Sequence, residues 1–417
     1  MIVRHLSLTN FRLYARLELD LPAGLTIILG DNAQGKTSLL EAIYFLATSH
    51  SPHTHADRQI IRWGAEEDGP YPYAALKAQI ERKDINAGPS ETLRAHSLEM
   101  VIQKGELNRL KKEIRIDRLS KRGIDLVGQL NVVLFLPGDV ELASGAPTLR
   151  RDFLDAALSQ VDAGYVRALD QYEKALAQRN ALLRQSGERG RGREVDPDEI
   201  AVWDDKLVPA GVQISLVRRQ AIADLSRLAM PIHRELSNGT EYLQVVYQPN
   251  FDPAAPTSLD QNFQIGLEMA GPPNGVKQQE LERAFRNALA ERQREEMARG
   301  VTLVGPHRDE MRFMVNGADL GNFGSRGQQR TSVLALKLAQ VEWMRERTHE
   351  EPVLLLDEVL AELDPHRRRC LLMRIGGVHQ TIVTTTDLGR FDQDFVQAAQ
   401  VLQVQSGIVA PPTTDAR

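Results

Sequence analysis

Cysteine is nearly absent from this chain, which carries one, Cys370, in 417 residues. A single thiol excludes a disulfide within the chain and a cysteine-based metal cluster, and it fits a reducing compartment. Long hydrophobic runs are also lacking. No stretch approaches the ~18 consecutive apolar residues of a membrane-spanning helix, and residues 1–14 have no apolar core like that of a signal peptide. These absences predict a cytoplasmic protein with no membrane association.

Neither sign of charge is in large excess. The chain has 51 basic and 56 acidic residues and a formal net charge of −5. A net negative charge repels nucleic-acid phosphates. A nucleic-acid binder of this composition must therefore concentrate its basic side chains in one part of its surface. The segment 104–122, with eight basic and three acidic residues, is the best candidate for a DNA contact.

Hydrophobic periodicity divides the chain into an α/β part in two sequence-distant pieces and a mostly helical insertion. Strands are predicted at 2–9, 14–20, 24–29, 71–82, 96–103, 108–116, 310–315, 353–357 and 381–385. In the helical part, Pro209 is expected to separate two helices or to kink one. We predict a discontinuous head of residues 1–128 and 301–417, an insertion of residues 129–300, and a disordered tail at 406–417.

A phosphate-binding loop lies in the first piece. The segment "LTIILGDNAQGKTSLLEAI" holds the complete P-loop spacing, between an apolar strand and a helix. Its glycines let backbone N–H groups approach a phosphate, Lys36 neutralises β- and γ-phosphate oxygens, and Thr37 offers a hydroxyl to Mg²⁺. The sequence therefore predicts a nucleotide site. The residues assigned to it are Gly30, Asp31, Asn32, Ala33, Gln34, Gly35, Lys36, Thr37 and Ser38.

The acidic partner of this loop follows an apolar run near the other end of the chain. Residues 353–356 read as a strand buried on both faces, and Asp357 follows at its carboxyl end, where parallel sheets place ligands. Asp357 is expected to hold Mg²⁺, and Glu358 to accept a proton from the attacking water. Lys36 and Asp357 are 357 − 36 = 321 residues apart. That separation is typical of an ATPase with an inserted domain.

A second anion site is indicated at "SRGQQ", residues 325–329, because a helix N-terminus presents free N–H groups. Such a site is redundant in an enzyme with one P-loop. In ABC-type ATPases, however, two heads enclose two ATP molecules, and a signature helix of one subunit faces the P-loop of the other. The segment resembles that signature, with Ser325, Gly327 and Gln328 acting in trans on a partner's ATP. A helix simply capped by serine is the structural alternative.

Seven motifs together resemble one family, the RecF recombination mediator ATPases, which are related to SMC proteins. The motifs are "LTNFRLY" (8–14), "GDNAQGKT" (30–37), "LFLPGDVELASGAPTLRRDFLD" (134–155), "GPHRDE" (305–310), "SRGQQRTSVLALKLA" (325–339), "LLLDEVLAELD" (354–364) and "TTTD" (384–387). They cover the chain nearly end to end, and the third and fourth are not shared with transporters. The implied fold is α/β, an ABC/SMC-type P-loop ATPase head with an inserted, mostly helical second lobe and no long coiled coil.

The resemblance implies an ATP-dependent DNA-binding protein of recombinational repair, with weak DNA-stimulated hydrolysis and a homodimer formed with ATP. It implies binding to double-stranded DNA and to gaps or single-strand/double-strand junctions, and loading of recombinase with RecO and RecR. Roles in DNA replication and the SOS response, and a nucleoid-associated location, are implied as well. By position, Arg12 would reach the nucleotide phosphates and Asp364 would be the D-loop acid. Thr386 and Asp387 stand where many ABC ATPases carry a switch histidine.

Two other functions stay open on the sequence alone. One is an ABC-type ATPase subunit of another machine, such as a transporter, and the other is a DNA scaffold that uses ATP without significant turnover. A metal site at His50, His53 and His55 is not expected, because no cysteine, and among carboxylates only Asp57, lies near enough to complete a tetrahedral set.

Overall fold

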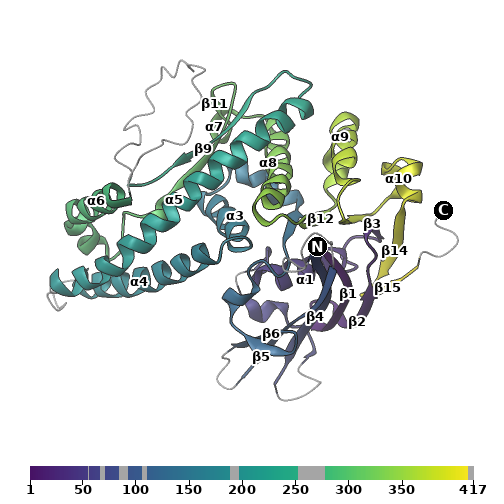
Figure 1. Ribbon diagram of the computed structural model, residues 1–417, viewed down its shortest axis with the longest axis horizontal. Helices are drawn as coiled ribbons and strands as arrows, with labels where there is room; N and C mark the ends of the chain where they lie inside the picture. Colours follow the sequence, from purple (N-terminus) through teal and green to yellow (C-terminus); the bar gives the residue numbers. More distant parts are fainter. Residues whose placement is uncertain are drawn as a thin grey trace. The chain divides into compact units, whose positions relative to one another are not determined.

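The computed structural model describes residues 1–54, 56–65, 71–83, 93–105, 110–187, 197–251 and 278–411. The chain forms two compact units, one of residues 1–139 and 340–417 and one of residues 140–339 (Figure 1). The strands of the first unit are β1 (Ile2–Phe11), β2 (Tyr14–Asp20), β3 (Gly24–Leu29), β4 (Tyr73–Lys83), β5 (Leu93–Lys104), β6 (Leu110–Ile116), β7 (Leu119–Lys121), β8 (Val132–Phe135), β12 (Val353–Asp357), β13 (Gln380–Thr385), β14 (Ala399–Gln405) and β15 (Ile408–Ala410). Its helices are α1 (Lys36–Thr48), α9 (Pro365–Ile375) and α10 (Gln393–Gln397).

Two sheets build the first unit. One is antiparallel, in the order β2-β1-β4-β5-β6-β7, and the other has the order β15-β14-β3-β13-β12-β8. In the second sheet every neighbouring pair from β14 to β8 is parallel. β12 is buried along its whole length, as its continuous apolar sequence predicts for a strand covered on both faces. The order places β13 between β3, which leads into the P-loop, and β12, which ends at Asp357.

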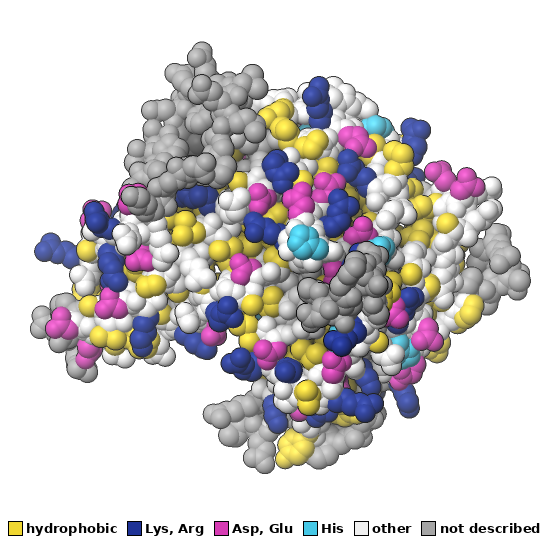
Figure 2. All heavy atoms as spheres, in the orientation of Figure 1, with side chains coloured by type: hydrophobic (Ala, Val, Ile, Leu, Met, Phe, Trp, Pro, Cys, Tyr) yellow, Lys and Arg dark blue, Asp and Glu magenta, His cyan; other side chains and the backbone are white. Residues whose placement is uncertain are grey.

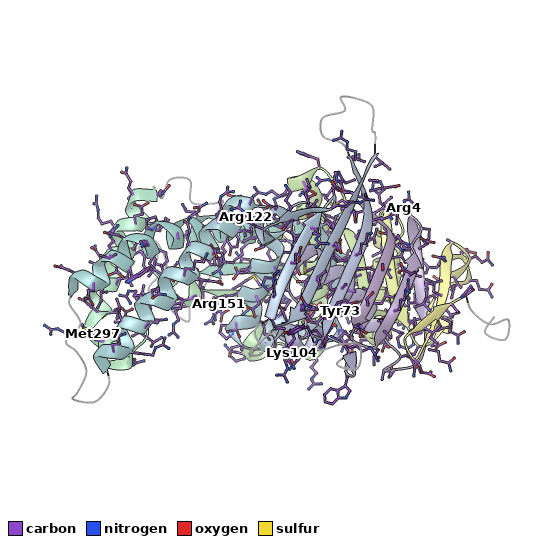
Figure 3. All side chains as sticks on the ribbon, turned by 90° about the horizontal axis from the view of Figure 1, so that it is seen from below. Arg4, Tyr73, Lys104, Arg122, Arg151 and Met297 are labelled. Atoms are coloured by element: carbon purple, nitrogen blue, oxygen red, sulfur yellow. The ribbon has the colours of Figure 1, made fainter. Side chains whose placement is uncertain are left out.

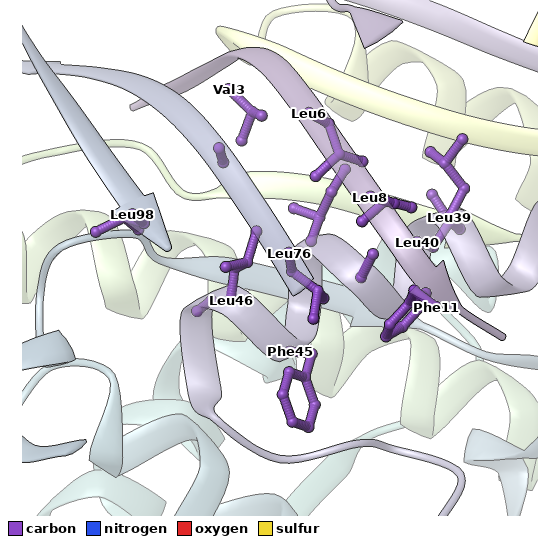
Figure 4. Close-up of a cluster of buried hydrophobic side chains, with 14 of the residues drawn as sticks. Val3, Leu6, Leu8, Phe11, Leu39, Leu40, Phe45, Leu46, Leu76 and Leu98 are labelled. Carbon is purple, nitrogen blue, oxygen red and sulfur yellow. The ribbon is translucent and has the colours of Figure 1, made fainter. Parts of the chain in front are cut away.

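Helix α1 and the antiparallel sheet share one hydrophobic core. Alternate residues of β1 are buried, and nine of the 13 residues of α1 are buried, so the helix is covered on more than one side. Figure 4 shows part of this core, with Val3, Leu6, Leu8 and Phe11 of β1 near Leu39, Leu40, Phe45 and Leu46 of α1 and Leu76 and Leu98 of the neighbouring strands. The helix that begins at the P-loop is therefore fixed by packing along its whole length.

The second unit is mostly helical. Its elements are α2 (Glu141–Ser144), α3 (Pro147–Ser159), α4 (Ala163–Gly187), α5 (Pro197–Leu236), β9 (Leu243–Gln248), α6 (Gln278–Arg299), β10 (Glu310–Val315), β11 (Ala318–Asp319), α7 (Leu320–Phe323) and the start of α8 (Arg326–Thr348). Of the two outcomes expected at Pro209, the separation of two helices is wrong, because α5 runs through Pro209 and Pro231 as one helix of 40 residues, and a kink at Pro209 stays a prediction. Each proline removes one backbone hydrogen bond, but α5 packs along α4 and β9 (Figure 1), which hold the helix together.

Residues 301–339 pack with the second unit, whereas the sequence groups them with the ATPase head. β10 pairs with β9 from Glu310↔Gln248 to Val315↔Leu243. On α8, the Ser332 hydroxyl contacts Nε2 of the buried His233 of α5 at 3.1 Å. The segment that carries the predicted signature is therefore held by elements of the helical unit.

The C-terminal segment contributes to the parallel sheet. The sequence predicts a disordered tail from residue 406, but β15 pairs with β14 through Gln403↔Ala410 and Gln405↔Ile408. The expectation is wrong for residues 408–410, because the Ser406-Gly407 turn, with φ values of 50° and 76°, folds the chain back on β14. Residues 412–417 lie outside the described part of the chain.

Candidate nucleotide-binding site

The P-loop joins β3 to α1 and depends on two glycines. A Cβ on Gly30 would lie 2.4 Å from the carbonyl oxygen of Val404 on β14. Gly35 has a φ of 115°, and a Cβ there would lie 3.0 Å from the hydroxyl oxygen of Tyr14. The O–H group of Tyr14 donates to the Gly35 carbonyl at 3.0 Å. Burial raises the pKa of Tyr14 and keeps it a donor. The loop is therefore held from two sides, while Asp31, Asn32 and Ala33 at its tip are exposed.

A turn near the C-terminal end of the described chain fixes the middle of the loop. The Gly407 N–H donates to the Gln34 carbonyl at 3.1 Å, and the Ser406 N–H donates to Gln34 Oε1 at 2.6 Å. The contact between Ser406 and Gln34 joins residues 372 positions apart. Sequence reasoning missed Ser406 and Gly407, because the Ser-Gly pair reads as an ordinary turn in a polar tail.

Lys36 lies at the mouth of the loop with 4% of its side chain exposed. Its ammonium donates to the carbonyl oxygens of Gly30 and Asp31, at 2.8 and 2.9 Å. The third contact of Nζ is Glu358 Oε1, at 2.9 Å. The two residues that the sequence assigns to phosphate binding and proton transfer are thus brought together, although Lys36 begins α1 and Glu358 follows the end of β12.

Asp357 meets Thr37 at the same place. The Thr37 hydroxyl donates to Asp357 Oδ2 at 2.8 Å across 320 positions of sequence. Only 5% of Asp357 is exposed. A hydroxyl and a carboxylate oxygen in contact form a hard-oxygen donor pair that suits Mg²⁺. These two side chains would hold the metal, and Ser38, the next residue of α1, is partly buried beside Thr37.

Glu358 has an unusual backbone conformation. Its φ is 50° and its ψ 12°, in the left-handed region that non-glycine residues rarely enter. Its N–H donates to the Thr384 hydroxyl at 3.0 Å, and that hydroxyl donates to Asp357 Oδ1 at 2.7 Å. Strained residues of this kind concentrate at functional sites. The sequence carries no signal for the strain, and Thr384 was part of a matched motif without an assigned role.

Arg12, in the turn after β1, forms an ion pair with Glu41 of α1. Its guanidinium donates to both carboxylate oxygens of Glu41, at 2.6 and 2.9 Å, and to the Gln59 carbonyl at 2.9 Å. The Glu41 side chain is 2% exposed, so this is a buried ion pair. The predicted contact of Arg12 with the nucleotide phosphates stays a prediction.

Asp364 begins helix α9. Its Oδ1 accepts the N–H groups of His366 and Arg367, both at 3.0 Å, and its Oδ2 pairs with the Arg367 guanidinium at 2.9 Å. Burial alone would raise the pKa of Asp364, but the bonds from Arg367 and His366 and the Arg367 charge outweigh it, so the pKa is lowered. The side chain is an N-cap, and its predicted D-loop role stays a prediction.

The chain resembles known proteins over nearly its whole length. The model of the RecF/RecN/SMC N terminal domain matches residues 2–410. The DNA replication and repair protein RecF of Chloroflexus aurantiacus is 44% identical over 98% of this chain and 99% of its own length. The chain belongs to the RecF family. The protein of the same name from Geobacillus thermodenitrificans is 38% identical over 99% of this chain.

A solved structure agrees with the fold of this RecF-family chain. The recombination mediator protein RecF-ATPrS in the RecFOR pathway superimposes with a TM-score of 0.80 at 27% identity, over 99% of this chain and 98% of that one. The predicted family and the predicted ABC/SMC-type head fold are therefore confirmed. Within the described ranges, no helix is both long enough and apolar enough to span a bilayer.

In this RecF-family chain the predicted signature segment lies in the second unit, at the start of α8. The Ser325 N–H donates to Gln328 Oε1 at 3.0 Å, and the Gln328 N–H donates to Ser325 Oγ at 3.2 Å, which is a reciprocal cap. Gln328 Nε2 donates to Glu241 Oε1 at 2.9 Å. Because a carboxylate can only accept, this bond determines which side of the Gln328 amide carries the nitrogen. Ser325 and Gly327 are exposed. Glu241, in the loop before β9, carried no sequence signal.

The basic segment 104–122 is only partly available for DNA. Lys112 pairs with Asp57 at 2.8 Å, and Arg115 pairs with Glu113 at 2.8 Å. Lys111 and Lys121 are exposed. Figure 3 shows Lys104 and Tyr73 at one end of the antiparallel sheet and Arg4 at the other. On the face drawn in Figure 2, Lys and Arg are interspersed with Asp and Glu.

The histidine cluster shows no sign of a metal site where it can be described. His50 contacts the Thr48 carbonyl at 2.9 Å through Nδ1. No group of three His, Cys, Asp or Glu side chains suited to a metal occurs within the described ranges. His55, the third histidine, lies outside them.

Proposed function

We propose that this chain is an ATP-dependent DNA-binding protein of recombinational repair, which hydrolyses ATP weakly and faster with DNA. The observation that carries the proposal is the meeting of four side chains at the end of the parallel sheet, Lys36 with Glu358 and Thr37 with Asp357. They supply a phosphate counter-charge, a general base and a metal-binding oxygen pair in a chain whose named relatives are DNA replication and repair proteins.

The contacts of Lys36 suggest how binding prepares hydrolysis. An ammonium has three protons, and here its three acceptors are two P-loop carbonyls and Glu358. A γ-phosphate oxygen that takes the third contact releases the Glu358 carboxylate, which then accepts a proton from the attacking water. Thr37 and Asp357 would hold Mg²⁺, which would neutralise charge at the phosphates. Lys36 thus keeps the base occupied until a phosphate arrives.

Membership of the RecF family also supports the proposed partners of this chain, which are a second copy of itself, DNA, RecO and RecR. Two copies associate with ATP, and Ser325, Gly327 and Gln328 of one copy contact the nucleotide of the other. Because Ser325 Oγ accepts the Gln328 N–H, its own proton is left for a phosphate oxygen. The dimer binds double-stranded DNA and single-strand/double-strand junctions and helps RecO and RecR to load recombinase, in the cytoplasm at the nucleoid. Roles in replication and the SOS response follow from the same DNA binding.

Two variants test the proposal. Glu358→Gln should bind ATP like the parent, hydrolyse it roughly 10²–10⁴ more slowly, and accumulate as an ATP-bound dimer in light scattering. Lys36→Ala should lose ATP binding and the dimer together. Both are measured with and without gapped DNA. If the parent binds ATP and DNA but its turnover equals that of Glu358→Gln, the chain is a scaffold that does not depend on hydrolysis. ATP binding and dimerisation of Lys36→Ala at the parent level would refute the site assignment.

A further inference from the structure

Thr384 lies at the centre of the candidate site and has no assigned role. It is on β13, between the strand that leads into the P-loop and the strand that ends at Asp357. The parallel register sets Thr384 beside Asp357, and 1% of its surface is exposed. A polar side chain this deeply buried needs hydrogen-bond partners, and its partners are the two acidic residues of the site.

The Thr384 hydroxyl makes two bonds of opposite sense. Oγ1 donates to Asp357 Oδ1 at 2.7 Å and accepts the N–H of Glu358 at 3.0 Å. The Leu356 carbonyl oxygen is farther away, at 3.4 Å. A hydroxyl has one proton, and the nearer, charged acceptor holds it more strongly. One side chain therefore contacts both Asp357 and Glu358.

For Asp357, the consequence is a fixed carboxylate. Thr384 occupies Oδ1, and the Thr37 hydroxyl occupies Oδ2 at 2.8 Å. The two threonines approach from different elements, β13 and α1, so rotation of the carboxylate breaks at least one bond. Outer hydrogen bonds of this kind orient metal ligands.

For Glu358, the consequence is a fixed peptide. Its left-handed backbone is strained for a residue with a side chain. The bond from its N–H to Thr384 holds that peptide in place, and from there the Glu358 carboxylate reaches Lys36 Nζ at 2.9 Å. Without a hydrogen-bond acceptor at position 384, the Glu358 N–H loses this bond, and the left-handed backbone conformation of Glu358 is less stable.

We propose that Thr384 is a positioning residue that sets both the metal-binding carboxylate and the general base. The inference rests on the proposed function. Thr384 touches neither nucleotide nor metal in this role, and acts only through Asp357 and Glu358.

The test compares variants of matched size. Thr384→Val keeps the volume and removes the hydroxyl, and the pair Thr384→Ser and Thr384→Ala differ only in the hydroxyl. The control is Thr381→Val, on the same strand, where the native threonine is equally buried and donates to the Ile375 carbonyl at 3.3 Å. ATP affinity is measured in Mg²⁺ and in EDTA, alongside kcat. Thermal unfolding shows which variants are folded.

In Thr384→Val, kcat should fall roughly 10- to 100-fold. The ratio of ATP affinity in Mg²⁺ to ATP affinity in EDTA should fall about 10-fold. Its ATP affinity in EDTA should match the parent, since the P-loop is untouched. Thr384→Ser should stay near the parent, while Thr384→Ala follows Thr384→Val. Thr381→Val should change neither quantity. If Thr384→Val does not fold, the Ser and Ala pair decides.

The role is refuted if folded Thr384→Val keeps the parental ratio of affinities in Mg²⁺ and EDTA, or if Ser and Ala variants are equally impaired. If Thr381→Val loses as much kcat and Mg²⁺-dependent affinity as Thr384→Val, the cause is the general packing of β13 and the role is refuted as well. Failure of the proposed function is separable, because it appears as parental hydrolysis in Glu358→Gln, whereas the ratio of affinities does not depend on turnover.

Discussion

Replacing Arg12 with alanine should destabilise the first unit even when no nucleotide is added. The Glu41 carboxylate is 2% exposed and accepts two charge-assisted hydrogen bonds from Arg12, at 2.6 and 2.9 Å. Removing one partner of a buried ion pair costs about 3–5 kcal/mol, because the other charge stays buried. Glu41 keeps a hydrogen bond from the Ser51 hydroxyl, and Arg12 itself is 21% exposed. We therefore expect Arg12→Ala to lower the free energy of unfolding by an amount at the lower end of that range, roughly 3 kcal/mol.

The assay is thermal unfolding of the purified protein. For a unit of this size each kcal/mol moves Tm by roughly 2–4 °C, so Arg12→Ala should lower Tm by about 6–12 °C. The double variant Arg12→Met with Glu41→Met leaves no unpaired charge and should recover most of that loss. Arg16→Ala, at an exposed position of β2, should change stability by less than about 0.5 kcal/mol.

Either of two results would refute this reasoning about Arg12. If Arg12→Ala unfolds at the parental Tm but binds ATP more weakly, the arginine serves the nucleotide and the ion pair with Glu41 contributes nothing. If the double variant is less stable than either single variant, the two side chains act independently, and the buried charge is not the cause.

Three further outcomes are expected. A mixture of Ser325→Arg and Lys36→Ala proteins, each inactive alone, should regain part of the parental hydrolysis, because a mixed dimer has one site with both residues intact; no gain in proven mixed dimers would contradict action in trans. Burial lowers the pKa of His307 from 6.5 to about 4, so the unfolded chain binds the extra proton between these values. The second unit should therefore lose roughly 3 kcal/mol as pH falls through that window, and urea unfolding of His307→Gln should show a flatter pH dependence. Lys111→Ala combined with Lys121→Ala should reduce the slope of log affinity for DNA against log salt by about 2, and an unchanged slope would place the DNA contact elsewhere.

The parts of the site that could be predicted are those set by local sequence. The P-loop spacing and the strand at 353–357 combine glycine positions with an unbroken apolar run, and both lie where the sequence placed them. The register of the sheet could not be read in the same way. Contacts such as Gln34 with Ser406 depend on which strand lies beside which, and that order is decided by packing over the whole unit.

Other misses have the same origin. Thr384 reads as one of three threonines in a strand, and only its place beside Asp357 distinguishes it. The continuous helix through Pro209 contradicts local propensity because contacts with α4 and β9 outweigh one lost hydrogen bond. The predicted role of Arg12 came from a motif, and the motif contains no hint of Glu41, which lies 29 positions away.

The position of β3 has a consequence for synthesis of the protein. Both strands that flank it, β13 and β14, come from residues after 379. β13 begins 380 − 29 = 351 residues after β3 ends, which at ~5–20 residues per second is roughly 20–70 s of translation. Throughout that time the growing chain carries an apolar strand with neither edge covered, a form prone to pair with other chains. A ribosome-bound fragment that stops before residue 380 should therefore need a chaperone and fail to bind ATP, although its P-loop is already complete.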